Sequence, residues 1–235
     1  MKYDIFCINL KTRPDRLNNI KKIFYKLGIL DKVNFHIVEN HCKGPRFGCF
    51  NSHIECLEMS KGDYTIIFED DCIENVKFKW ETMINIIEKH FQNEKYGYFS
   101  IGNNLLLMTY KMIDNENNVI ENNFSYCLAY AIKKSCYEKL KEKMNFYIDY
   151  IHIDFFLAFH LKNKIGFNTP YFKQNLFNTN NKWAPNNTLD YILRLCVLLG
   201  EKNIIMKLII HILTVIIGYY VELSIYIYEI LKLKK

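Results

Sequence analysis

Residues 64–71 read Tyr64-Thr65-Ile66-Ile67-Phe68-Glu69-Asp70-Asp71, an apolar run followed at once by three carboxylates. The first five residues are all β-branched or aromatic and follow a Gly-Asp break, a pattern that predicts a buried strand. Ligands of open α/β sheets bind beyond the carboxyl ends of the strands. We therefore expect residues 69–71 at a ligand-binding edge of a sheet.

Strand and helix patterns alternate on both sides of this segment. Polar loops are predicted at 44–48 and 114–123. Such alternation is typical of an α/β fold in which helices cover both faces of a mostly parallel sheet. The predicted strands are 3–10, 33–38, 64–68, 98–101 and 125–132, and the predicted helices are 14–27, 51–60, 78–91, 134–143 and 153–162.

The composition fits a folded domain and excludes several classes of protein. Half of the 235 residues are apolar and 15% are aromatic, which is enough to bury a sizeable core. Four Pro and nine Gly exclude a collagen-like or linker-like chain. The net charge of +6 is modest and the Lys residues are scattered, so we predict no nucleic-acid partner.

Cysteine usage indicates a reducing compartment. The eight cysteines form no Cys-x-x-Cys pair, which argues against a zinc knuckle. The even spacing of Cys42, Cys49 and Cys56 is interpreted as coincidence. The amino terminus has no signal-peptide pattern. We expect a cytoplasmic protein in which most cysteines are buried small hydrophobic residues.

The three consecutive carboxylates at 69–71 have two interpretations. Their mutual repulsion is costly unless a cation joins them, and carboxylate oxygens suit Mg²⁺ or Mn²⁺. Alternatively, they form an acidic turn that caps a helix. Both interpretations remain open from these residues alone.

Arginine is scarce in this chain, with four Arg against 27 Lys, yet Arg13 and Arg16 both follow the first predicted strand. The planar guanidinium group suits forked contacts with phosphate or carboxylate. The two residues are therefore candidates for binding an anionic ligand. The alternative is an ordinary surface ion pair, such as Arg13 with Asp15.

Three motifs together resemble glycosyltransferase family 25, which includes bacterial lipopolysaccharide-biosynthesis glycosyltransferases and collagen β-galactosyltransferases. The resemblance covers residues 3–175 and departs from the family pattern at Asn51 and at 152–154. A weaker likeness follows at 129–132. The three motifs are Ile8-Asn9-Leu10 with Arg13-x-Asp15-Arg16-Leu17, then Gly48-Cys49-Phe50-x-Ser52-His53, then Ile66-Ile67-Phe68-Glu69-Asp70-Asp71.

This resemblance implies a GT-A-like fold and a UDP-sugar donor whose diphosphate is bound through Mn²⁺ or Mg²⁺. It makes Asp71 the foremost metal ligand, Asp70 a ligand or ribose contact, and Glu69 a ligand or a residue that orients its neighbours. His53 could instead be a helix cap or a hydrogen-bonding core residue. The further donor-site residues are Asn9, Arg13, Arg16, Ser52, His53 and Gly102, the last because a glycine lets the backbone approach the sugar.

Family members invert the anomeric centre, which requires a general base for the acceptor hydroxyl. Asp154 best matches the late aspartate of the family, and Asp149 is the alternative. A helix amino-terminal cap is a competing role for Asp154. The expected acceptor is a hydroxyl group on a glycan, a lipid-linked sugar or a protein.

The carboxyl-terminal segment 188–235 is predicted to be an apolar helical tail behind a catalytic domain of residues 1–187. Residues 204–235 fit a helix lying on a membrane surface, a helix packed on protein, or a tail anchor. The predicted activity is therefore metal-dependent transfer of galactose or glucose from a UDP-sugar. The alternatives are a metal-dependent phosphohydrolase or nuclease, and a catalytically degenerate, membrane-associated binding module.

Overall fold

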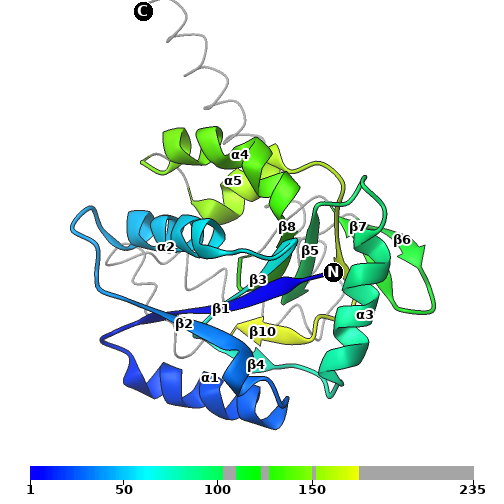
Figure 1. Ribbon diagram of the computed structural model, residues 1–235, viewed down its shortest axis with the longest axis horizontal. Coiled ribbons are helices and arrows are strands. Elements are labelled where there is room, and N and C mark those ends of the chain that lie inside the picture. Colours follow the sequence, from blue (N-terminus) through cyan, green and yellow to red (C-terminus); the bar gives the residue numbers. More distant parts are fainter. Residues whose placement is uncertain (103–109, 123–126, 150–151, 175–235) are drawn as a thin grey trace, which may run out of the picture. The chain divides into compact units, whose positions relative to one another are not determined.

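The computed structural model describes residues 1–102, 110–122, 127–149 and 152–174 (Figure 1). The predicted tail at 188–235, with its membrane-surface segment at 204–235, lies outside these residues. Among the helices that the structure describes, none combines the length and apolar character needed to cross a bilayer.

The described residues form a ten-stranded mixed sheet in the order β2-β1-β3-β8-β5-β9-β7-β6, with β10 beside β5 and β4 beside β10. The pairings make β4, β7 and β8 run against the other strands, so most strands share one direction. The strands are β1 (Tyr3–Leu10), β2 (Val33–Val38), β3 (Tyr64–Glu69), β4 (Cys72–Glu74), β5 (Tyr98–Gly102), β6 (Tyr110–Asp114), β7 (Val119–Asn122), β8 (Ala129–Lys133), β9 (Lys164–Phe167) and β10 (Phe172–Gln174).

Helices cover both faces of this sheet. Side chains of α1 and α3 pack with one set of strand residues, and side chains of α2, α4 and α5 pack with the other. The predicted α/β class, with a mostly parallel central sheet and helices on both faces, is therefore confirmed. The helices are α1 (Pro14–Lys26), α2 (Pro45–Met59), α3 (Trp80–Phe91), α4 (Lys134–Tyr147) and α5 (Ile153–His160), and a short 3₁₀ turn spans Leu30–Lys32.

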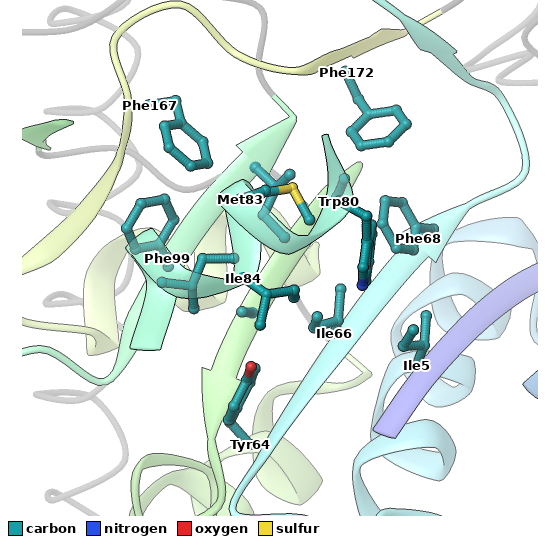
Figure 2. Close-up of a cluster of buried hydrophobic side chains, with 14 of the residues drawn as sticks. Ile5, Tyr64, Ile66, Phe68, Trp80, Met83, Ile84, Phe99, Phe167 and Phe172 are labelled. Carbon is teal, nitrogen blue, oxygen red and sulfur yellow. The ribbon is translucent and has the colours of Figure 1, made fainter. Parts of the chain in front are cut away.

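Strand β3 shows how the two-residue alternation of a strand divides the core. Ile66 and Phe68 enter the cluster that Figure 2 shows, in which Trp80 and Met83 of α3 lie among strand side chains. Ile67 enters the opposite cluster, under α2, α4 and α5. Each of these side chains is fully buried or nearly so, and such burial is worth about 1.5–3 kcal/mol per side chain. The residue after Phe68 consequently faces α2.

Two predicted loops are regular structure instead. Helix α2 begins at Pro45 rather than at residue 51, because Pro45 suits the first helical turn and Gly44 before it takes the positive φ of 93° that ends the preceding loop. The segment 114–123 contains the end of β6, a turn and β7. Asn118 adopts φ 53° in that turn, a conformation that Asn tolerates better than most residues.

Candidate functional site

The carboxyl ends of the parallel strands β1 and β3 meet at one edge of the sheet, where Ile8 lies opposite Glu69. Asn9 follows on β1, and its Nδ2 donates to Asp70 Oδ2 at 2.5 Å. The backbone N–H of Leu10 donates to the same oxygen at 3.3 Å. Since these contacts join residues 60 and 61 positions apart, Asp70 fastens the end of β1 to the turn after β3.

Arg16 of α1 supplies the cation at this edge. Its Nη1 lies 3.0 Å from Asp70 Oδ1 and 3.9 Å from Asp71 Oδ2, and the side chains of all three residues are buried. Arg13 instead forms a bidentate ion pair with the exposed Asp15, with a shortest N–O distance of 2.7 Å. The two arginines therefore differ: Arg16 binds the acidic segment directly, and Arg13 makes the ion pair that the sequence offered as the alternative.

The two carboxylate oxygens of Asp71 have different surroundings. Its Oδ2 accepts a hydrogen bond from Gln174 Nε2 of β10 at 3.1 Å. Its Oδ1 is buried and has no hydrogen-bond partner among the described residues. Burial, followed by the neighbouring charge of Glu69, raises the pKa of Asp71 to about 7. A buried carboxylate oxygen without a donor is costly, and a divalent cation would satisfy it.

Glu69 belongs to different surroundings from the two aspartates that follow it. The strand alternation turns its side chain toward α2, where Oε1 lies 3.3 Å from His53 Nε2 and 3.8 Å from Cys49 Sγ. Burial, followed by the charge of Asp70, raises the pKa of Glu69 to about 7. The three consecutive carboxylates are therefore divided between two sides of the sheet edge.

His53 lies in the middle of α2 and is completely buried, so it does not cap that helix. Its Nδ1 is 2.9 Å from the Tyr130 hydroxyl, and burial lowers the pKa of the imidazole to about 4. The ring is therefore neutral at physiological pH. The preceding Ser52 donates its hydroxyl hydrogen to the Gly48 carbonyl at 2.8 Å, within the same helix.

Gly102 ends β5 where three strands crowd together. A Cβ atom at this position would lie 2.9 Å from the Cβ of Ala129 and 3.2 Å from that of Phe172. This packing alone accounts for glycine at the position, and its predicted approach to a sugar stays a prediction.

The two candidate bases have unlike environments. Asp154 Oδ1 accepts a hydrogen bond from the Cys127 backbone N–H at 2.7 Å, and burial followed by the charge of Glu69 raises the pKa of Asp154 to about 6. It is the second residue of α5, whose N-cap position is His152, so the proposed capping role is not observed. Asp149 is about half exposed and forms an ion pair with Lys43 at 2.9 Å.

Gln174 is the contact that sequence reasoning missed. The three residues of β10 are too few to predict a strand from the sequence. The antiparallel pairing of Gln174 with Cys72 brings its amide beside Asp71. Lys173 and Asn175 flank Gln174, so no local hydrophobic pattern marks this position.

Comparison with known proteins gives structural similarities alone. No protein-family model matches the chain, and no curated protein sequence gives a significant match. An apo UDP-glucose pyrophosphorylase is similar with a TM-score of 0.42 and 12% identity, covering 73% of this chain and 74% of that one. S. aureus TarS 1–349 in complex with UDP-GlcNAc is similar with a TM-score of 0.45 and 8% identity. The match covers 83% of this chain and 64% of that one. GalNAc-T7 with UDP, GalNAc and Mn²⁺ also has a TM-score of 0.45 and 8% identity, covering 82% of this chain and 48% of that one, so the chain spans about half of its length. Each is a similarity of overall architecture.

Proposed function

We propose that this chain is a metal-dependent, inverting glycosyltransferase that transfers galactose or glucose from a UDP-sugar to an acceptor hydroxyl. The observation that carries the proposal is the buried Asp71 Oδ1, which has no hydrogen-bond partner within the described part of the chain. The other oxygen of this carboxylate lies 3.9 Å from the Arg16 guanidinium group, at the carboxyl edge of the sheet. Ligands of such sheets bind at this edge. The family resemblance of the same residues supplies the class of reaction.

The donor set fits a hard divalent cation. Asp71 would hold Mn²⁺ or Mg²⁺ through Oδ1, and Asp70 remains a predicted ligand. Glu69, which was also predicted as a ligand, faces His53 and Cys49 of α2 and is not included in this donor set. When bound, such a cation offsets the negative charge that develops on the departing UDP. Arg16 offsets part of the repulsion between Asp70 and Asp71, and Asn9 holds Asp70 in place. The chain thus keeps the carboxylates apart from bulk water and in a fixed arrangement.

Asp154 is the proposed general base. A carboxyl group with a pKa of about 6 is ionised at neutral pH and is more basic than an ordinary aspartate, as proton transfer from a hydroxyl group requires. The Cys127 N–H donates to Asp154 Oδ1 at 2.7 Å and so fixes the orientation of the carboxylate. Asp149 is less suited, because it is about half exposed and already forms an ion pair with Lys43.

Calorimetry of the full-length chain with UDP, with and without Mn²⁺, tests the donor site. Wild type is expected to bind UDP more tightly with Mn²⁺, and Asp71→Ala is expected to lose the Mn²⁺-dependent part. Equal UDP binding by both proteins would show that Asp71 does not hold the cation.

Release of UDP from UDP-galactose and UDP-glucose, measured with glycan, lipid-linked and protein acceptors, tests the base. Asp154→Asn should lower kcat about 10²- to 10⁴-fold while UDP affinity is kept. Asp149→Asn is the matched control and should turn over normally. Full turnover by Asp154→Asn would place the base elsewhere.

A further inference from the structure

Cys49 and His53 occupy successive turns of α2, four residues apart, and so lie on one face of the helix. Glu69 extends toward that face from the end of β3. The Cys49 Sγ atom, a ring nitrogen of His53 and a carboxylate oxygen of Glu69 all lie within 4.8 Å of one another. Thiol, imidazole and carboxylate are therefore gathered at one point of the partly buried interface between helix and sheet.

The spacing of these atoms fits one tetrahedral ion. Zinc lies about 2.3 Å from thiolate sulfur and about 2.0–2.2 Å from imidazole nitrogen or carboxylate oxygen. Two corners of such a tetrahedron are then about 3.3–3.6 Å apart. The observed separations from Glu69 Oε1 are 3.3 Å to His53 Nε2 and 3.8 Å to Cys49 Sγ. Small side-chain adjustments would close the difference.

The imidazole of His53 is oriented by a group outside the cluster. The Tyr130 hydroxyl lies 2.9 Å from Nδ1, which leaves Nε2 facing Glu69 and Cys49. Metal-binding histidines are commonly held in this way through their second ring nitrogen. Tyr130 is itself fully buried in β8, so this orientation is rigidly supported.

We propose that Cys49, His53 and Glu69 form a Zn²⁺-binding site with three protein ligands and a water in the fourth position. Thiolate and imidazole ligands favour Zn²⁺ over Mn²⁺ and Mg²⁺. On binding, the Cys49 S–H bond breaks, its proton passes to water and a sulfur–zinc bond forms. The site is separate from Asp71 and does not depend on the transferase activity, although it assigns Glu69 to zinc.

Titration of the reduced, metal-free, full-length protein with Co²⁺ tests the site, because Co²⁺ substitutes for zinc and reports its ligands by absorption. We expect a thiolate-to-cobalt charge-transfer band and strong visible bands typical of tetrahedral Co²⁺, both abolished by excess Zn²⁺. Cys49→Ser should lose the charge-transfer band. Cys136→Ser, a matched change at another partly buried free cysteine, should keep it. Tyr130→Phe should keep the band and weaken binding about 10- to 100-fold.

Absence of the band from wild type, or its persistence in Cys49→Ser, overturns the proposal. A second measurement avoids variants altogether: Zn²⁺ should slow alkylation of Cys49 at least tenfold in the wild-type protein, with Cys42, which is exposed, reacting at an unchanged rate. Equal alkylation of Cys49 with and without Zn²⁺ also overturns it. A cobalt band in a protein that fails to bind UDP with Mn²⁺ would refute the proposed function and leave the zinc site standing.

Discussion

Replacing Asp71 by Asn should stabilise the metal-free protein at neutral pH. The carboxylate is buried beside Glu69, and the Gln174 amide and the more distant Arg16 only partly offset the cost of its charge. Asn has nearly the same shape and no charge. Its side-chain oxygen can still accept the hydrogen bond from Gln174. The variant therefore removes the charge and keeps the packing.

The pKa of Asp71 fixes the sign and size of this effect. Its folded-state value of about 7 lies above the ordinary value of 3.8, so between these pH values the folded protein holds the proton more firmly than the unfolded chain. Wild-type stability therefore falls as pH rises, by about 1.4 kcal/mol per pH unit in this window and about 4 kcal/mol in all. Glu69 shares the repulsion, so we expect Asp71→Asn to gain about 2–4 kcal/mol above pH 7.

Urea unfolding in metal-free buffer at a series of pH values measures the difference. The gain should be largest above pH 7 and shrink steadily toward pH 4. Asp4→Asn is a control of opposite sign: burial alone would raise the pKa of Asp4, but hydrogen bonds from the Lys61 and Gly62 N–H groups and from Ser60 lower it. That variant should lose stability at neutral pH and approach wild type in acid.

Saturating Mn²⁺ should reverse the order of the two proteins. A ligand at 1,000 times its Kd stabilises the folded state by about 4.1 kcal/mol, which exceeds the expected advantage of the variant, and Asp71→Asn should receive little of this. A variant that is no more stable than wild type at about pH 8, or a gain that does not change with pH, would refute the reasoning from burial and charge.

Three further predictions concern stability. Arg16→Leu leaves the buried Asp70 carboxylate without its cation and should cost about 3–5 kcal/mol in urea unfolding, with Arg16→Lys costing less; a loss under 1 kcal/mol would contradict the buried pair. Gly62→Ala places a Cβ 2.8 Å from the Cα of Tyr3 and should cost about 1–3 kcal/mol by thermal melting, since backbone cannot move aside easily. Lys164 donates to two carbonyls at the end of α5, and burial lowers its pKa to about 8. The free energy of unfolding of the wild-type protein should therefore rise between pH 8 and 10.5, and this rise should be absent from Lys164→Met.

The fold could be read from the sequence wherever a pattern was long. The strands at 3–10 and 64–69 and the helices at 14–26 and 80–91 each carry a full run of periodic apolar residues. Strands β4, β9 and β10 could not be predicted from the sequence, because a segment of three or four residues is too short to show a hydrophobic period. Their places in the sheet depend on pairing with partners distant in sequence, which a local pattern does not contain.

The sequence predicted where the site lies in the fold better than it predicted how the side chains of the site are oriented. Parallel strands ending in polar residues identified the edge where Asn9, Asp70 and Asp71 meet. The three consecutive carboxylates suggested one shared environment. However, Glu69 is still part of β3, and the alternation of that strand directs its side chain toward α2, away from the side of Asp71. The heptad spacing of three cysteines was interpreted as coincidence. The cluster of metal-type ligands contains Cys49 and does not include Cys56, which is buried elsewhere along α2.

The charges gathered at this edge connect stability to cation binding. Glu69, Asp71 and Asp154 each have a raised pKa because burial disfavours their ionised forms and because Glu69 repels both aspartates. One guanidinium group, that of Arg16, bridges Asp70 and Asp71 and offsets only part of this charge. The remaining repulsion is a standing cost to the metal-free fold, and a divalent cation bound at the proposed site would relieve it. Because Glu69 faces α2 and Asp71 faces β10, a soft and a hard cation would each find a different set of ligands, and loss of one should leave the other bound.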